Sequence, residues 1–190
     1  LVNCARSTET LSVDSNGVSQ HEDLIKEMEL AVFGPYRLIN LLIDNAFELT
    51  SIVNISTQYS IVAPNPNLYP DGLTSSSIGY GIAKSALNHL TRELAVRLSK
   101  HKVRVNAVAF GAIDTRLTSP YENEPNIAIV KGQERKVGLS NQQIEQANTA
   151  SPLGRIGSPE DAANAIYLMC IPESNWITGE VLLASGGVRS

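Results

Sequence analysis

Short runs of apolar and β-branched residues recur along the chain and predict the strands of a sheet. The runs cover residues 1–5, 51–56, 103–110 and 180–184. The first three are apolar at successive positions rather than at alternate ones, so we expect helices to cover both of their faces. The pattern therefore predicts a buried, parallel sheet.

The segments between these runs carry apolar residues at helical spacing. Such spacing extends from residue 21 to about residue 47, from 80 to 100, and over 142–150. Gly34-Pro35 interrupts the first segment, and we expect a kink or break there because proline lacks the N–H that a helix interior needs. These segments predict the helices that separate the strands.

One more helix is predicted to begin after Ser158. A serine cap, followed by Pro159 at the first helical position and by Asp161 two residues later, is a helix start signal. Strands and helices then alternate along residues 1–190, which predicts a single α/β domain with right-handed crossovers. Residues 64–79 and 115–140 are polar and mixed, and we expect both to be irregular.

Composition and charge exclude several classes of protein. The chain has 43% hydrophobic and 18% charged residues, enough to bury one core. The net charge of -4 argues against a basic nucleic-acid-binding face. The sequence has no stretch of 18 apolar residues, so we expect no membrane span in it. Cys4 and Cys170 have no metal-ligand spacing, so we expect two buried free thiols in a reducing cytoplasm.

Tyr80 and Lys84 carry the most specific candidate chemistry. Four residues apart on a predicted helix, they lie roughly 40° apart around its axis and one turn apart along it. A lysine ammonium close to a phenol favours the phenolate, and such a tyrosine can exchange a proton with an alcohol or a carbonyl. The pair alone is a weak signal because any exposed helical pair has this spacing.

The segments around the pair strengthen the signal. A buried strand that ends in hydroxyls, residues 51–57, precedes the tyrosine, and residues 104–115 follow it. The C-terminal part adds residues 152–161, with the sequence PLGRIGSPED, then Ile-Thr-Gly at 177–179 and Gly-Gly at 186–187. In this order the segments resemble the short-chain dehydrogenase/reductase family over essentially the whole chain. Residues 1–5 look like that family's fourth strand.

The resemblance implies a Rossmann-like, doubly wound parallel sheet with helices on both faces, in three layers and N-terminally incomplete. It implies hydride transfer between NAD or NADP and a secondary alcohol or ketone, without a metal. Tyr80 would exchange the proton, Lys84 would assist it and bind the nicotinamide ribose, and Thr57 would hold the reacting oxygen. The implied cofactor contacts are Tyr80, Lys84, Asn3, Ala5, Gly111, Ile113 and Thr115.

The sequence also departs from the family's pattern. A Gly-x-x-x-Gly-x-Gly turn, which in the family receives the cofactor pyrophosphate at a helix N-terminus, does not occur in the 190 residues. Ala31 stands where the family has a relay asparagine, Thr57 replaces serine, and Arg6 replaces glycine. A second hypothesis is therefore a non-catalytic scaffold or an inactive remnant.

The substrate is suggested by a narrower resemblance. Residues 55–74 are similar to the oxidoreductases of flagellin-glycan and nonulosonate sugar gene clusters, which points to an activated sugar. A 3-ketoacyl thioester is the alternative. The loops that would decide between them are residues 64–79 and a substrate loop at about 115–150.

Several residues keep two interpretations. The Thr57 hydroxyl can simply satisfy local backbone at the strand end, and Asn3 can be only a buried polar residue bonded to the backbone. Arg155 is expected as a structural ion-pair partner more than as a substrate ligand, and Trp176 as a core or interface anchor. By resemblance, the helices within residues 28–47 and 80–100 would pair in a homodimer or homotetramer.

Overall fold

A parallel sheet forms the centre of the computed structural model, which describes residues 1–7, 9–11, 18–45, 48–65, 76–115, 126–130, 133–137 and 139–188. Its strands are β1 (Val2–Asn3), β2 (Ser51–Thr57), β3 (Arg104–Phe110) and β6 (Val181–Ala184), in the order β1-β2-β3-β6. All neighbouring pairs are parallel. The predicted α/β class and the four strands are confirmed, although β1 is only two residues long.

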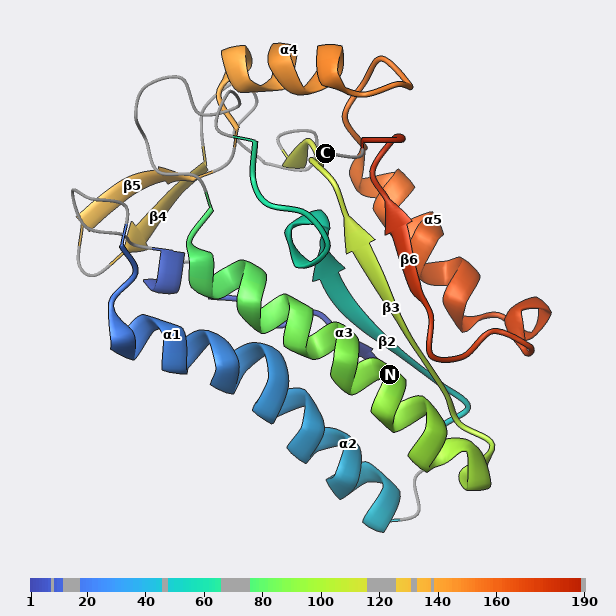
Figure 1. Cartoon of the computed structure of the whole chain (residues 1–190). Coiled ribbons are helices and arrows are strands. Elements are labelled where there is room, and N and C mark those ends of the chain that lie inside the picture. The colour runs from blue at the N-terminus through green and yellow to red at the C-terminus, as the bar shows by residue number, and fades with distance from the viewer. Residues whose placement is uncertain are drawn as a thin grey trace.

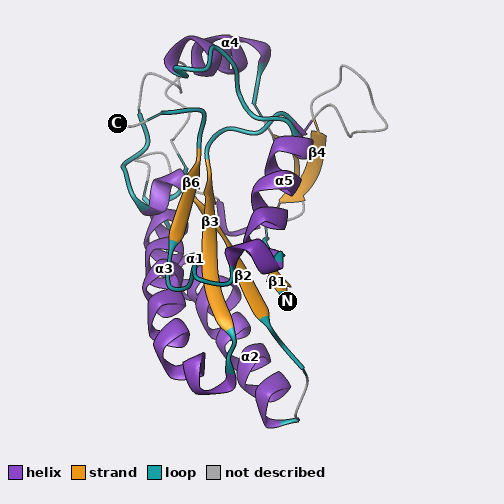
Figure 2. Ribbon diagram, turned by 90° about the vertical axis from the view of Figure 1, so that its right-hand side faces the viewer, coloured by secondary structure: helices purple, strands orange, loops and turns teal. Residues whose placement is uncertain are grey.

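Helices cover both faces of this sheet (Figure 2). One face carries α1 (His21–Met28), α2 (Gly34–Asp44) and α3 (Ile78–Leu98), and the other carries α5 (Pro159–Cys170). The remaining helix, α4 (Asn141–Ala150), lies beyond the end of the sheet to which β2 and β3 point (Figure 1). This is the three-layer arrangement that the sequence predicted.

Alternate side chains of the strands pack into two hydrophobic cores, one on each face of the sheet. This explains why the strands are apolar at successive positions. Ile52 and Val105 are fully buried against the helices of one face, in a cluster with Ile39 of α2. Val53, next to Ile52, and Val108, three residues after Val105, are fully buried on the opposite face, with residues of α5. Fully covered parallel strands have this continuous apolar character.

The predicted break at Gly34-Pro35 is wrong in form. A π-helical segment, Glu29–Phe33, joins α1 to α2 without interruption. The Gly34 N–H donates to the Glu29 carbonyl, five residues earlier, where an α-helix would use four. The wider turn precedes Pro35, which has no N–H to offer, so the helix widens and continues instead of ending.

The expectation of an irregular segment over residues 115–140 is also wrong in part. Strands β4 (Asn126–Val130) and β5 (Gln133–Val137) form an antiparallel pair, with Asn126 opposite Val137. The sequence signal was a short apolar run at residues 127–130 followed by a glycine at position 132, since glycine commonly marks a turn. Residues 66–75 of the other segment lie outside the described residues.

Three burial expectations are corrected. Cys4 and Cys170 are free thiols, as expected, but both are exposed, because Cys4 follows the short edge strand and Cys170 ends α5. Trp176 is fully exposed and therefore not a core residue. Within the described parts of the chain, no helix is both long and apolar enough to cross a membrane.

Candidate functional site

The candidate residues gather where the parallel strands end. Thr57 and Phe110 are the last residues of β2 and β3 and pair with each other at the carboxyl end of the sheet. Asn3, the last residue of β1, pairs with Asn54, three residues before Thr57. Ligands of open α/β folds bind outside the carboxyl ends of the strands. Because α3 begins at the same edge, the first two turns of this helix stand beside that region.

The start of α3 places Tyr80 and Lys84. Ser77 caps the helix, accepting a hydrogen bond from the Tyr80 N–H at 3.4 Å. Gly81 allows close packing of the first turn, because a Cβ there would lie 3.0 Å from the Tyr59 carbonyl oxygen. Gly81 thus lies between Tyr80 and Lys84, at a position where the close approach of the Tyr59 backbone favours glycine.

Lys84 is buried over β2. Its side chain is 6% exposed, and its Nζ donates to the Ile55 carbonyl at 2.7 Å, two residues before Thr57. Burial lowers the pKa of Lys84, the carboxylate of Glu27 opposes that shift, and Arg6 adds to it. Desolvation is the largest cause, because burial disfavours the charged form of an ammonium group.

Arg6 was noted in the sequence only as a departure from the family pattern. In the structure its guanidinium carbon lies 4.6 Å from the centre of the Tyr80 ring, a distance that suits a cation–π contact. A positive charge therefore stands next to the candidate proton donor on the solvent side, while Lys84 is buried beneath it. Sequence spacing gave no signal for this contact, since 74 residues separate the two side chains.

Thr57 ends β2 and caps the short 3₁₀ helix Gln58–Ser60. Its Oγ1 accepts from the Tyr59 N–H at 3.4 Å, so the interpretation as a local backbone partner has a real basis. The bond uses only an acceptor site of the hydroxyl, whose O–H can still donate. Both interpretations of Thr57 therefore remain compatible with the geometry.

The 3₁₀ helix after Thr57 is tied to α3 through Ser60. Asn88 Nδ2 donates to Ser60 Oγ at 2.8 Å, and Ser85 Oγ donates to the Ser60 carbonyl at 2.8 Å. Ser60 Oγ in turn donates to the Thr57 carbonyl at 2.5 Å. These bonds hold the strand end that carries Thr57 against the helix that carries Tyr80.

Asn3 is part of a buried polar chain that links β1, β2 and α3. Its Nδ2 donates to Asn54 Oδ1 at 2.7 Å, and Asn54 Nδ2 donates to Thr91 Oγ1 at 2.9 Å. Thr91 Oγ1 then donates to the Leu87 carbonyl at 2.9 Å. Asn3 therefore has a structural partner, which is a side chain and not the backbone.

The loop after β3 holds the other cofactor candidates. Gly111 packs so closely that a Cβ there would lie 2.9 Å from Ser185 Cα. Ile113 forms an isolated parallel bridge with Gly157, and a Cβ on Gly157 would lie 2.5 Å from the Ile113 side chain. Thr115 is exposed at the end of this loop. The C-terminal residues around Gly157 thus support the loop from behind.

Gln58 is a polar residue at this edge that the sequence did not single out. It is buried, and its Oε1 has no hydrogen-bond partner among the described residues. That oxygen would lie 3.2 Å from a Cβ on Gly111, so it sits between the end of β2 and the loop after β3. A buried acceptor of this kind can receive an N–H or O–H from a ligand.

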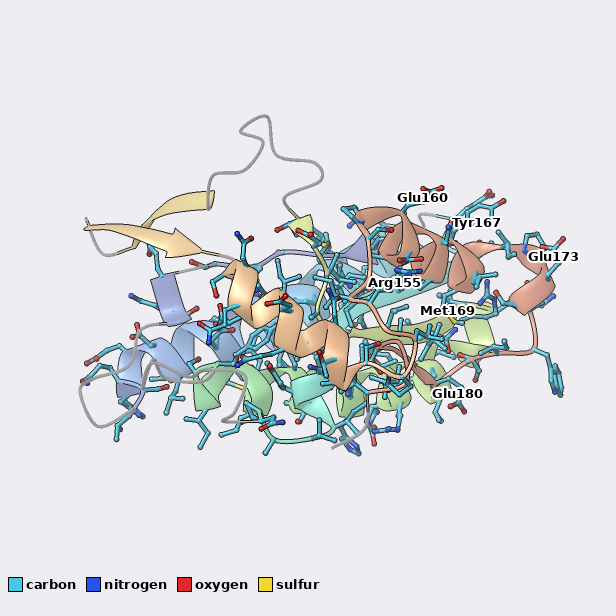
Figure 3. All side chains as sticks on the ribbon, turned by 90° about the horizontal axis from the view of Figure 1, so that it is seen from above. Arg155, Glu160, Tyr167, Met169, Glu173 and Glu180 are labelled. Carbon is cyan, nitrogen blue, oxygen red and sulfur yellow. The ribbon has the colours of Figure 1, made fainter. Side chains whose placement is uncertain are left out.

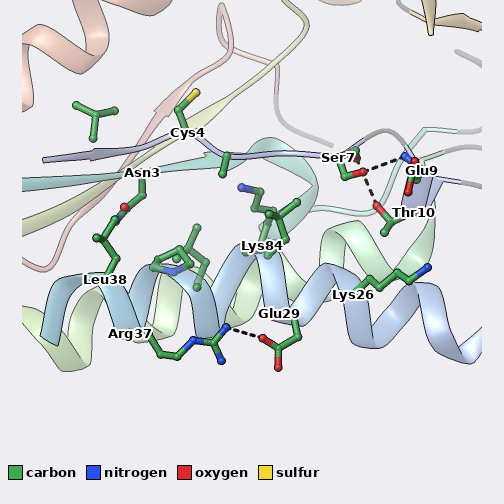
Figure 4. Close-up of a pocket in the computed structure, with 17 residues that line it drawn as sticks. Asn3, Cys4, Ser7, Glu9, Thr10, Lys26, Glu29, Arg37, Leu38 and Lys84 are labelled. Atoms are coloured by element: carbon green, nitrogen blue, oxygen red, sulfur yellow. Dashed lines mark hydrogen bonds and ion pairs between the residues drawn. The ribbon is translucent and has the colours of Figure 1, made fainter. Parts of the chain in front are cut away.

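A cavity of about 640 Å³ opens beside β1 (Figure 4). Asn3, Ala5 and Lys84 line it, together with Ala31 from the π-helical segment. Its remaining walls come mainly from the segment after β1 and from α1 and α2. Three of the predicted site residues, Asn3, Ala5 and Lys84, therefore share this cavity.

The other predicted site residues are not among the residues that line this cavity. They lie at the ends of β2 and β3 and at the start of α3: Thr57, Tyr80, Gly111, Ile113 and Thr115. The structure thus divides the predicted set between the β1 cavity and the adjoining sheet edge. Within the described residues, no three or more His, Cys, Asp or Glu side chains are placed to hold a metal ion.

Arg155 makes the structural ion pair that was expected. Its guanidinium binds Asp161 in the first turn of α5 at 2.5 and 3.1 Å, and Figure 3 shows it beside that helix. The predicted cap is also confirmed, since Ser158 and Asp161 form a reciprocal capping box. Hydrogen bonds from Arg155 and Ser158 hold the pKa of Asp161 well below its usual range.

Comparison with known proteins gives consistent matches. Residues 1–189 match a family model described as enoyl-(acyl carrier protein) reductase. A 7alpha-hydroxysteroid dehydrogenase of Paraclostridium sordellii is 35% identical over 179 residues, which cover 92% of this chain and 57% of that protein. A tropinone reductase homolog of Arabidopsis thaliana is 36% identical over 115 residues, covering 60% of this chain and 37% of its own. The chain thus spans about half the length, or less, of such curated relatives.

Solved structures share the fold. A short-chain dehydrogenase from Leptospira borgpetersenii with bound NAD+ superposes with a TM-score of 0.74 at 22% identity, over 98% of this chain and 63% of that one. A 4-hydroxyisoleucine dehydrogenase complexed with NADH gives a TM-score of 0.71 at 20% identity, over 98% and 66%. These likenesses establish the Rossmann-like architecture.

Proposed function

This chain belongs to the short-chain dehydrogenase/reductase family, and from that premise we propose that it serves hydride transfer between a nicotinamide cofactor and a secondary alcohol or ketone. The observation that carries the proposal is the arrangement of Tyr80 and Lys84 at the carboxyl edge of the sheet. Lys84 is buried beneath the end of β2, and Tyr80 precedes it by one turn, close to the start of α3. This arrangement supports a proton-transfer role, because ligands of open α/β folds bind outside the carboxyl ends of the strands.

Each residue has a distinct role in this proposal. Tyr80 exchanges the proton at the substrate oxygen, and Lys84 stabilises the phenolate through its charge. The Thr57 O–H donates to the same oxygen, which stabilises negative charge that develops there. The 3₁₀ helix that ties Thr57 to α3 supports this role because it limits relative movement of the two groups.

NAD or NADP is the cofactor that we propose, and when bound it supplies or accepts the hydride. The fit rests on Lys84, whose ammonium has three N–H donors and gives one to Ile55, leaving donors for ribose hydroxyls. Asn3 and Ala5 line the same cavity, and Gly111, Ile113 and Thr115 would meet the nicotinamide from the adjoining loop. These residues therefore support a site for the nicotinamide half of the cofactor.

The substrate is the finer part of the proposal. The similarity of residues 55–74 to sugar-cluster oxidoreductases favours an activated sugar. The curated relatives instead include a 7alpha-hydroxysteroid dehydrogenase. The description of the matching family model is enoyl-(acyl carrier protein) reductase. A panel of UDP-, GDP- and CMP-sugars, 3-ketoacyl thioesters and 7-hydroxysteroids, assayed by NAD(P)H absorbance, would separate these classes.

We further propose a cytoplasmic homodimer or homotetramer. Large apolar side chains stay exposed on the outer helices, at Phe33, Tyr36, Leu41, Ile82 and Val96. A second copy of the chain would cover them through α2 and α3, the helices expected to pair. Two free thiols agree with a reducing compartment. Light scattering at several protein concentrations tests the assembly, and a concentration-independent monomer would refute it.

Tyr80→Phe tests the catalytic proposal directly. The variant loses only the hydroxyl, so we expect turnover to be abolished while the fold and cofactor binding persist. Circular dichroism and NAD(P)H fluorescence titration provide the controls. A turnover rate equal to that of the unmodified protein would remove Tyr80 from the mechanism.

A non-catalytic role is the second candidate. It is favoured by one observation, namely that Ala31, which has no polar side-chain atom, lies in the π-helical segment beside Lys84, where the family has a relay asparagine. In that case we expect no NAD(P)H binding by the 190-residue chain. A saturable change in NAD(P)H fluorescence on titration with the chain would instead support the enzyme hypothesis.

A further inference from the structure

Glu27 is a buried carboxylate that none of the roles above uses. Its side chain is 2% exposed on α1, and Thr10 Oγ1, itself buried, donates a hydrogen bond to Glu27 Oε1. Burying a carboxylate is costly unless hydrogen bonds or an opposite charge compensate for it. Among the described residues this hydroxyl is the hydrogen-bond donor to Glu27, and one hydroxyl is a small compensation, so a nearby cation would help to explain this burial.

The packing of α1 against α3 places Glu27 at the level of Lys84. The Leu24 side chain contacts α3 at Gly79, where a Cβ would lie 2.6 Å from it. Further along both helices, Ala31 packs in one cluster with Ala83 and Leu87 of α3. Glu27 lies between the two contact points on α1, as Lys84 lies between them on α3. The two buried, opposite charges are therefore within about one helical turn of each other along the interface.

We propose that Glu27, held by Thr10, is a positioning residue that keeps the Lys84 ammonium charged beneath the sheet edge. Lys84 and Glu27 are both buried, on α3 and α1 respectively. Glu27 therefore lies on the helix that packs against the one carrying the lysine. Its importance for catalysis rests on the proposed function, whereas its effect on Lys84 does not.

The charges around Lys84 agree with this role. Burial lowers the pKa of the lysine, and Glu27 is the largest influence that raises it. Arg6 lowers it further, and the sulfur of Cys4 raises it slightly. Other titratable groups nearby are Tyr80 on the same helix and the buried Asp23, one turn before Glu27. Loss of the Glu27 charge would thus leave Lys84 with burial and Arg6 opposing its protonation.

An NMR titration of the 190-residue chain, labelled with ¹³C at the lysine ε-carbons, tests the proposal without turnover. The Lys84 signal is assigned from its loss in Lys84→Arg. In Glu27→Gln, which keeps an acceptor for Thr10, we expect the Lys84 midpoint to shift to lower pH. Glu22→Gln, which removes an exposed carboxylate from the same helix, should leave it unchanged. A Lys84 midpoint that is the same in Glu27→Gln and Glu22→Gln overturns the proposal.

A conservative variant keeps the test decisive. Glu27→Asp retains the charge but withdraws it by one methylene, so its Lys84 midpoint should fall between those of the unmodified chain and Glu27→Gln. If Glu27→Gln does not fold, an unshifted midpoint in Glu27→Asp overturns the proposal instead. Where turnover is found, the alkaline limb of the pH–rate profile should move to lower pH in Glu27→Gln. Absence of turnover refutes the proposed function alone, because the lysine titration is still measurable.

Discussion

Replacing Thr91 by valine should show how much the buried polar chain contributes to the fold. Valine has nearly the same shape but lacks the oxygen that accepts from Asn54 Nδ2 at 2.9 Å. Thr91 and Asn54 are both fully buried, so water cannot replace the lost acceptor. A buried donor left without a partner costs about 1–3 kcal/mol. The Leu87 carbonyl, which also loses a donor, keeps its place in the helix ladder, so we assign most of the cost to Asn54.

Urea denaturation followed by circular dichroism measures this cost. The midpoint should fall while the slope stays constant, because the surface exposed on unfolding hardly changes. For a chain of this size, about 1–3 kcal/mol corresponds to a melting temperature lower by roughly 2–12 °C. Thr149→Val is the matched control, since Thr149 makes the same bond to a carbonyl four residues earlier, at 2.9 Å, but on an exposed helix face. Its effect should stay within about 0.5 kcal/mol.

A double-mutant cycle between Thr91→Val and Asn54→Ala isolates the contact itself. The two residues touch, so a coupling of about 0.5–3 kcal/mol is expected. Equal destabilisation by Thr91→Val and Thr149→Val would refute the reasoning, because burial would then make no difference. Strictly additive effects of Thr91→Val and Asn54→Ala would refute it as well.

Three further variants test other parts of the structure. Gly111→Ala forces a methyl to within 2.9 Å of Ser185 Cα, so we expect a destabilisation of roughly 1–3 kcal/mol in urea, and an unchanged midpoint would contradict the close packing. Ser158→Ala removes the cap of α5 and should cost about 1 kcal/mol by the same assay, with Ser158→Asn restoring most of it. The folded-state pKa of Asp161 is depressed, so its stabilisation is present above the ordinary aspartate range and is lost as the pH falls. Asp161→Asn should therefore lose less stability than the unmodified chain between pH 7 and pH 3, and parallel pH–stability curves would argue against the Arg155 contact.

Local patterns made much of the fold predictable. The strands and α3 follow from apolar spacing, and the start of α5 follows from Ser158 and Asp161, since caps depend on residues only a few positions apart. The β4–β5 hairpin was missed because its apolar run is brief and its second strand is polar. The continuous helix through Gly34-Pro35 was missed because proline normally ends a helix, and a π turn that accommodates it has no recognised sequence signal.

The candidate site could be proposed from the sequence only where a motif resembles that of the family. Tyr80, Lys84 and Thr57 come from that resemblance and stay predictions, whereas the contacts around them come from distant parts of the chain. Arg6 reaches the Tyr80 ring from the loop after β1, and Ala31 packs with Ala83 and Leu87 of α3. Such contacts depend on how elements pack, and one sequence does not reveal that. The full exposure of Trp176 was missed because a tryptophan side chain is usually largely buried, although Glu173, Ser174 and Asn175 before it are polar.

The π-helical segment has a consequence for insertions and deletions. Glu29–Phe33 accommodates one residue more than an α-helix would over the same turn. Deleting one residue there would let an ordinary α-helix form and would leave the later residues in nearly the same rotational register, because the wider turn already absorbs the extra residue. Deleting one residue within α1 would instead rotate everything that follows by about 100°. Ile39, fully buried against the sheet, would then turn away from the core. We therefore expect this helix to tolerate a one-residue deletion within Glu29–Phe33 better than one within α1.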